Sequence, residues 1–98
     1  MNITHVNEGK KITVGIEGRL DTATAPELEK FFEGVLAGAE ELVIDCEKLE
    51  YISSAGLRVI LKTQKTMNGQ GEMKLIHVNE MIMEVFDITG FADILKIE

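Results

Sequence analysis

Two adjacent serines, Ser53 and Ser54, are the best candidates for chemistry, because they stand where a strand and a short loop pass into a helix. Apolar residues recur after them at helical spacing, at Leu57, Ile60, Leu61 and Met67. We therefore expect a helix that begins close to Ser54 and places its hydroxyl at the N-cap. The first amides of a helix lack partners and the helix dipole is positive there, so a serine oxygen or an attached phosphate is favoured. Ser54 is thus a candidate phosphoacceptor, and the alternative is a residue that only caps the helix.

Two further features mark the start of this helix. Gly56 costs about 1 kcal/mol relative to Ala in a helical turn, which favours a close approach by another part of the backbone. Arg58, Lys62 and Lys65 follow at helical spacing and form a basic stripe on the solvated side of the helix. The stripe is either a surface for an acidic partner or the polar side that every amphipathic helix needs.

The other residue types give little support for catalysis or for a metal site. Neither His5 nor His77 has a nearby Cys or a suitably spaced His, so we expect structural or surface roles for both. The single cysteine, Cys46, follows an apolar run and should be a buried, inert thiol. No Ser-His-Asp order is convincing, and Asp21 and Asp45 are more typical of turns than of a catalytic carboxylate pair. We expect no enzyme activity, no cofactor and no metal.

Composition narrows the class of protein. The chain has 98 residues, 45% of them apolar, and a formal net charge of −7. This length and apolar content indicate one domain over residues 1–98, with its own core. No apolar run approaches the roughly 20 residues of a membrane span, and the polar start lacks the pattern of a signal peptide, so a cytoplasmic protein is expected. The acidic charge argues against nucleic acid or an anionic membrane as the partner and favours a protein with a basic surface.

The elements that must position these residues alternate between strands and helices. Period-2 alternation and short apolar runs predict strands at residues 3–6, 11–18, 42–44, 73–78 and 94–97. Apolar stripes at helical spacing predict helices over Thr24–Ala37, Ala55–Asn68 and from Met81 to near Gly90. The first of these opens with a capping-box pattern, in which Thr24 caps the helix and Glu27 reaches back.

These elements predict an α/β fold. The helix Ala55–Asn68 connects strands 42–44 and 73–78, so these two strands should be parallel neighbours. The two long helices should lie on the same face of a mixed sheet of four or five strands, because both carry apolar stripes. The core is expected to include Phe31, Phe32, Ile44, Leu57 and Leu61.

The order of these elements and motifs resembles the STAS domain family, the anti-sigma factor antagonist domain, over nearly the whole chain. Three segments carry the resemblance: Gly18–Thr22 with Ala25–Leu28, Val43–Asp45 followed by Ser53–Leu57, and Ile88–Phe91 with Ile94–Leu95. Asp21 matches the acidic residue that opens the family's first loop. Ser54 matches the phosphorylated serine of the family's Asp-Ser-x-Gly-Leu motif. Ser53 stands where much of the family carries Asp, which makes Ser53 an alternative phosphoacceptor.

The resemblance implies a fold and a function. The fold would be a STAS-like mixed sheet with helices packed mainly on one face. Family members of this size capture an anti-sigma factor that is also a serine kinase of the GHKL type, and thereby release a sigma factor. Phosphorylation by that kinase ends the capture, and a metal-dependent phosphoserine phosphatase restores it. The residues expected to border the partner are Asp21, Thr22, Ser53, Ser54, Gly56, Arg58, Lys62 and Lys65.

Two other functions are compatible with the same fold. The start of the Ser54 helix could hold a phosphate of a nucleotide or another small molecule, although no Gly-rich phosphate loop accompanies it. The domain could instead be a scaffold component of a larger regulatory assembly. Binding screens with nucleotides and size-exclusion chromatography of the native complex would distinguish these functions.

Overall fold

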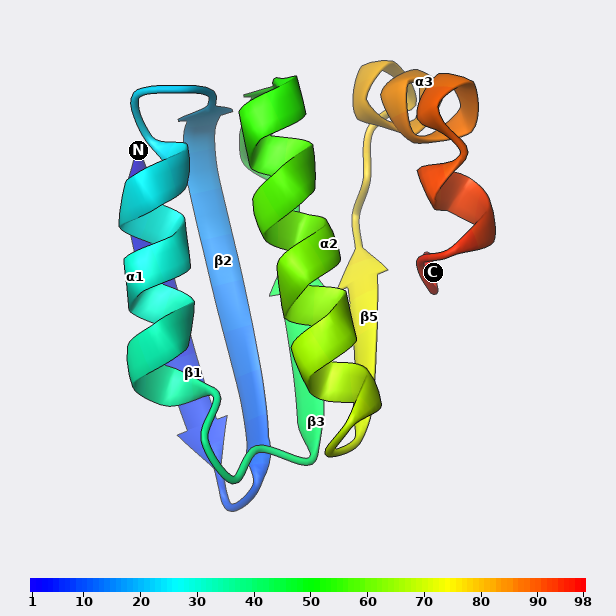
Figure 1. Cartoon of the computed structure of the whole chain (residues 1–98). Coiled ribbons are helices and arrows are strands. Elements are labelled where there is room, and N and C mark those ends of the chain that lie inside the picture. Colours follow the sequence, from blue (N-terminus) through cyan, green and yellow to red (C-terminus); the bar gives the residue numbers. More distant parts are fainter.

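A mixed sheet forms the centre of the computed structural model, which describes residues 1–98 (Figure 1). Its strands are β1 (Asn2–Glu8), β2 (Lys11–Leu20), β3 (Glu41–Asp45), β4 (Leu49–Ile52) and β5 (Glu72–Ile76). The order across the sheet is β1-β2-β3-β5, and β4 pairs with the end of β2. β1 is antiparallel to β2, whereas the other pairs are parallel. The predicted mixed sheet and the parallel pairing of β3 with β5 are confirmed.

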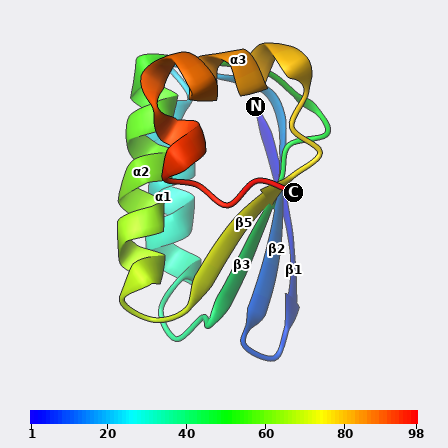
Figure 2. The same ribbon diagram turned by 90° about the vertical axis from the view of Figure 1, so that its right-hand side faces the viewer.

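Both long helices lie side by side on one face of this sheet. These helices are α1 (Ala25–Val35) and α2 (Ser54–Asn68), and the edge-on view shows that the opposite face of β1, β2 and β3 carries no helix (Figure 2). A third helix, α3 (Glu80–Thr89), lies beyond the carboxyl ends of the parallel strands and leads into the short 3-10 helix η1 (Phe91–Asp93). None of the helices is both long enough and apolar enough to cross a membrane.

The core fills the space between the sheet and the two helices. Alternate residues of β2 face the helices, and Val14 and Ile16 are buried there together with Ile44 of β3. From the helices, Phe32 of α1 and Leu57 of α2 contribute buried side chains, as predicted. Burial of these apolar side chains is the main source of the fold's stability.

Two of the predicted core residues are only half-buried, so that part of the prediction is wrong. Phe31 lies at the rim, where its ring meets that of His5 with 5.2 Å between centroids. Leu61 lies beside the inner stripe of α2, because the helix turns Ile60 and Thr63 toward the core instead. Burial of Thr63 is tolerated because its hydroxyl donates to the carbonyl oxygen of Val59 over 2.8 Å.

Two strand predictions need correction, and one strand was not predicted. β4 lies outside the predicted strand ranges, in the segment before Ser53 that was expected to be a loop. β5 ends at Ile76, one residue before His77 adopts a left-handed backbone conformation with φ of 58°. The predicted last strand at 94–97 is a single bridge between Ile97 and Leu75, because η1 occupies the residues before it.

Candidate functional site

The two serines lie at the start of α2, which begins one residue earlier than predicted. Ser53 is the N-cap residue and has an extended backbone, and Ser54 is the first helical residue. Because Ser53 occupies the N-cap position, the predicted N-cap role of Ser54 is wrong; Ser54 is an exposed residue of the first turn. Ser53 is half-buried, and its hydroxyl oxygen is shielded from solvent and makes no hydrogen bond. Of the two hydroxyls, therefore, only that of Ser54 is presented to a macromolecular partner.

The start of α2 is fixed against the end of β2. The backbone N–H of Ser53 donates to the carbonyl oxygen of Leu20 over 2.9 Å. Gly56 is buried against the end of β2: a Cβ atom at this position would lie 2.7 Å from Leu20 Cγ and 3.0 Å from the backbone carbonyl oxygen of Leu20. The close backbone approach predicted from Gly56 is confirmed, and it needs a residue without a side chain.

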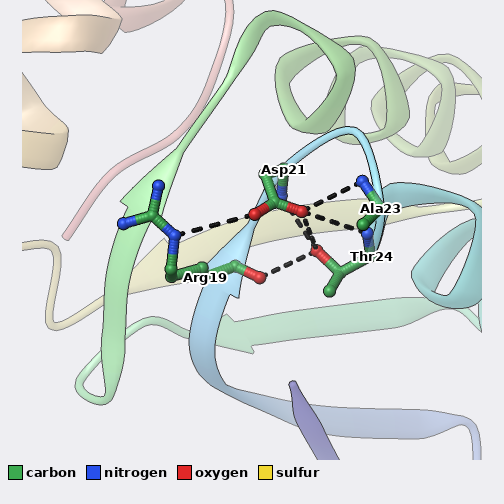
Figure 3. A network of polar contacts seen from close by, with 4 residues as sticks. All are labelled: Arg19, Asp21, Ala23 and Thr24. Atoms are coloured by element: carbon green, nitrogen blue, oxygen red, sulfur yellow. Dashed lines mark hydrogen bonds and ion pairs between the residues drawn. The ribbon is translucent and has the colours of Figure 1, made fainter.

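The loop after β2 is built around the Asp21 carboxylate (Figure 3). Asp21 Oδ1 accepts hydrogen bonds from the backbone N–H groups of Ala23 and Thr24, over 3.0 and 3.2 Å. The Thr24 hydroxyl accepts from the Asp21 N–H over 2.9 Å and donates to the carbonyl oxygen of Arg19 over 2.8 Å. Thr24 is the N-cap residue of α1 but makes no side-chain cap hydrogen bond, so the predicted capping box does not form. Its hydroxyl holds the loop instead.

Electrostatics favour the ionised form of Asp21. Desolvation acts to raise its pKa, but the pKa lies below its usual value because the carboxylate accepts hydrogen bonds from the Thr24 and Ala23 backbone and from the Thr24 side chain. The nearby positive charge of Arg19 acts in the same direction. The Arg19 Nε atom lies 3.6 Å from Asp21 Oδ2. The loop therefore presents a fixed negative charge close to the start of α2.

A shallow groove joins this loop to the face of α2. Its volume is about 260 Å³, and Thr22, Ala55 and Arg58 are among the residues that line it. Together with the Ser53–Leu20 hydrogen bond, the groove places the loop after β2 beside the first turns of α2, where Ser54 and Arg58 are exposed. The expected position of the loop is thus met, whereas the Ser53 hydroxyl is shielded from solvent and Lys65 does not line the groove.

The basic stripe on α2 is only partly available. Lys62 Nζ lies 3.1 Å from Glu29 and 3.6 Å from Glu33, both on α1. The hydrogen bond that Lys62 donates to the Glu29 carboxylate and the negative charge of Glu29 raise the pKa of Lys62 above its usual value. Lys62 therefore links the two helices. Arg58 and Lys65 are exposed and lie within 4.0 Å of no carboxylate, so they are the two cations of the stripe that can meet a partner.

Two residues beside the site were not identified from the sequence. Arg19 and Tyr51 face each other across the β2–β4 pair, with the guanidinium carbon 4.1 Å from the centre of the Tyr51 ring. This cation–π contact positions Arg19 beside Asp21. Tyr51 is visible in the sequence as an aromatic residue two positions before Ser53, but its contact with Arg19 can be recognised only once β4 is placed next to β2.

Cys46 is buried, as predicted, and its thiol is unsuited to nucleophilic chemistry. Burial raises the pKa of Cys46 to about 12, and the neighbouring charge of Asp45 acts in the same direction. The thiolate is the reactive form of cysteine, so almost none is available at neutral pH.

Comparison with known proteins agrees with this arrangement of strands and helices. The family model described as the STAS domain matches residues 3–98. The chain belongs to the STAS domain family. This STAS domain is 38% identical over 84 residues to BtrV of Bordetella bronchiseptica, which carries the provisional name of an anti-sigma factor antagonist; the match covers 84% of this chain and 72% of that protein.

Two further matches span almost the whole STAS domain. The anti-sigma-B factor antagonist of Staphylococcus aureus is 29% identical over 99 residues, which cover 99% of this chain and 92% of that protein. The structure of the Bacillus cell fate determinant SpoIIAA in its phosphorylated form superposes with a TM-score of 0.76 at 15% identity, and covers 99% of this chain and 91% of SpoIIAA. The similarity to SpoIIAA shows a shared fold and no more.

Proposed function

We propose that this STAS domain is an anti-sigma factor antagonist that works as a binding switch centred on Ser54. The observation that carries the proposal is the exposed Ser54 hydroxyl on the first turn of α2, beside the Asp21 loop. The names of the Bordetella and Staphylococcus relatives support the same role. The partner would be an anti-sigma factor that is also a serine kinase of the GHKL type.

Capture of the partner would use the surface on both sides of Ser54. Asp21 and Thr22 would contact it from the loop after β2, and Arg58 and Lys65 from α2. Ser53 and Gly56 would act through the backbone, because both are packed against β2, and Lys62 would contribute mainly by holding α1 beside α2. An interface with an anionic loop on one side and two cations on the other would demand complementary charges from its partner, which promotes specificity.

Phosphorylation of Ser54 would end the capture by changing the charge of this surface. A phosphoserine adds a charge of about −1.5 to −2 at neutral pH. The amides at a helix N-terminus favour an anion there, so the fold should tolerate the modification. In a closed interface the same charge would have to be desolvated without a partner, which costs several kcal/mol. SpoIIAA has been solved in a phosphorylated form, which supports a phosphorylation cycle in this family.

Ser54 is preferred to Ser53 as the phosphoacceptor because of their different environments. A kinase must align the acceptor hydroxyl with ATP, and the Ser53 oxygen is shielded from solvent while its backbone is bound to Leu20. A phosphoserine phosphatase would restore the binding form. The remaining parts of the proposal are a single domain over residues 1–98, located in the cytoplasm, that acts by binding protein, without catalysis of its own and without nucleic acid or membrane as a partner.

The decisive experiment incubates the purified protein with its GHKL-type kinase and ATP, and then maps the phosphate by intact-mass and peptide analysis. Ser54→Ala should accept no phosphate and retain binding of the kinase, whereas Ser54→Asp should weaken binding with the fold intact. Ser53→Ala is the matched control, since it removes the neighbouring hydroxyl only. Labelling of Ser54→Ala but not of Ser53→Ala would move the acceptor to Ser53. If neither substitution changes labelling or binding, the proposal is wrong.

A further inference from the structure

A second group of polar side chains lies at the carboxyl ends of β3 and β5. Asp45 is the last residue of β3, Glu47 follows it in the turn, and His77 follows β5. β3 and β5 are parallel neighbours, so their carboxyl ends meet at the same edge of the sheet. One carboxylate oxygen of each acid and one ring nitrogen of His77 all lie within 4.8 Å of one another.

The local backbone holds these groups together. Asp45 Oδ1 lies 2.9 Å from His77 Nδ1 and accepts a hydrogen bond from the Glu47 N–H over 3.0 Å. His77 has a φ of 58°, in the left-handed region that residues other than Gly rarely adopt. Asp45 is half-buried, whereas Glu47 and His77 are exposed. The group is therefore partly ordered by the fold and open to solvent on one side.

A cavity of about 560 Å³ adjoins this group on the sheet face that carries no helix. Asp45, Glu47 and Lys48 line it together with Gly15 and neighbouring residues of β1 and β2. The amino group of Lys48 lies 3.7 Å from the Glu17 carboxylate, so the cation beside the group already has an anionic neighbour. The cavity gives a bound ion access to water or to a further ligand.

We propose that Asp45, Glu47 and His77 form a binding site for a divalent transition metal ion of the Zn²⁺ class. One imidazole nitrogen and two carboxylate oxygens form a mixed nitrogen and oxygen donor set that suits Zn²⁺, whereas Mg²⁺ and Ca²⁺ favour oxygen alone. Zn²⁺ binds such atoms at about 2.0–2.2 Å, so the three donors, which now lie within 4.8 Å of one another, would draw closer together to share one ion. The acidic net charge of −7 also favours a cation.

Binding would replace the hydrogen bond between His77 and Asp45. The Nδ1 atom of His77 would present its lone pair to the metal, and the ring proton would reside on Nε2. Asp45 and Glu47 would each give one carboxylate oxygen. The other coordination positions would hold water from the cavity or a side chain of a bound protein. The three residues lie at the ends of β3 and β5 and not on α2, and the site does not depend on the proposed switch. It would also correct the expectation that His77 has no part in metal binding.

The test uses tag-free protein titrated with ZnCl₂ in a calorimeter, with MgCl₂ as the comparison ion, and two-dimensional NMR to locate the amides that shift. Wild type should bind one Zn²⁺ per chain and show its largest shifts around Asp45 and His77, with no binding of Mg²⁺. His77→Asn should weaken binding roughly tenfold or more, and Asn is chosen because it tolerates a left-handed backbone. Asp45→Asn and Glu47→Gln should weaken it as well.

His5→Gln is the matched control, because it removes an exposed histidine on β1 and should leave the affinity unchanged. Lack of saturable Zn²⁺ binding by wild type would overturn the proposal. Equal affinities of wild type and a folded His77→Asn, or equal losses in His5→Gln and His77→Asn, would do so too. If His77→Asn does not fold, the Asp45→Asn and Glu47→Gln titrations decide the question, and unchanged affinity in both would contradict the site.

Discussion

The backbone amide of Ser53 is bound to the carbonyl oxygen of Leu20, so the first turn of α2 is anchored to the last residue of β2. This single contact links the serines to the strand that also leads into the Asp21 loop. A charge placed on Ser54 therefore acts on a surface whose backbone is held in position. A switch of this kind would change what the surface binds without a change of fold.

The packing of Gly56 against β2 predicts the effect of adding one methyl group. Gly56→Ala should destabilise the protein by about 1–3 kcal/mol, because the new Cβ would come within 2.7 Å of Leu20 Cγ and 3.0 Å of the Leu20 carbonyl oxygen. Urea denaturation measures the change in the free energy of unfolding.

Gly34→Ala on α1 is the control for that measurement. Apart from its chain neighbours and the backbone of α1 itself, no atom lies within 4 Å of a Cβ placed at Gly34, so the higher helix propensity of Ala should stabilise the protein by about 0.5–1 kcal/mol. Equal effects of the two substitutions would show that the contact with β2 is not close.

The phase of α2 predicts different costs for two adjacent residues. Ile60 is only 2% exposed, so Ile60→Ala should cost about 2–5 kcal/mol. Leu61 is half-buried, so Leu61→Ala should lower the free energy of unfolding by less, about 1 kcal/mol. Denaturant melts of the two variants decide the point, and a larger loss for Leu61→Ala would mean that α2 is rotated from the orientation described.

The lowered pKa of Asp21 predicts an acid-sensitive contribution to stability. A carboxyl group with a lower pKa in the folded than in the unfolded state stabilises the protein above the unfolded value, and this contribution is lost as the pH falls through the folded value. The difference in unfolding free energy between wild type and Asp21→Asn should therefore be largest above pH 3.8, shrink as the pH falls below 3.8, and disappear only below the lowered pKa of the folded protein.

Urea melts across this pH range check the prediction for Asp21. Asp21→Asn keeps an oxygen that can accept the hydrogen bonds of the loop, so it isolates the charge. Glu84→Gln, at an exposed position on α3, is the control for a general loss of negative charge. A constant difference between wild type and Asp21→Asn at every pH would argue against the assigned shift.

The environment of Cys46 predicts a thiol that is protected only while the protein is folded. With a pKa of about 12 and almost no exposure, Cys46 should react with a thiol reagent far more slowly in the native protein than in urea. Labelling followed by absorbance gives both rates. Fast labelling of the native protein, at the rate seen in urea, would contradict the burial of this residue.

Much of the fold follows from patterns that are local in the sequence. The alternation of Ile12, Val14 and Ile16 predicts the buried side of β2, and the apolar stripes predict α1 and α2 and their common face. β4 escaped prediction because it has only four residues, and two of them, Glu50 and Tyr51, are exposed. Its strand character comes from pairing with β2, about thirty residues earlier in the chain.

The candidate site likewise contains some features that the sequence predicts and others that depend on tertiary contacts. Residue types alone identify Ser54 as a candidate phosphoacceptor and Gly56 as a point of close approach. The roles of Thr24 and Lys62 depend on tertiary partners, because the hydroxyl of Thr24 is used by the Asp21 loop and the charge of Lys62 by two acids of α1. The contact between Asp45 and His77 likewise requires β5 to lie beside β3.

The position of β2 has a consequence for the order in which the chain folds. β2 pairs with three other strands. A tight turn at Gly9 connects it to β1, whereas the whole of helix α1 separates it in the sequence from β3 and β4. Closing a long loop costs more chain entropy than closing a short one, so distant pairings form later. We therefore expect the β1–β2 hairpin to form early, and the docking of β3 along its other edge to limit the folding rate.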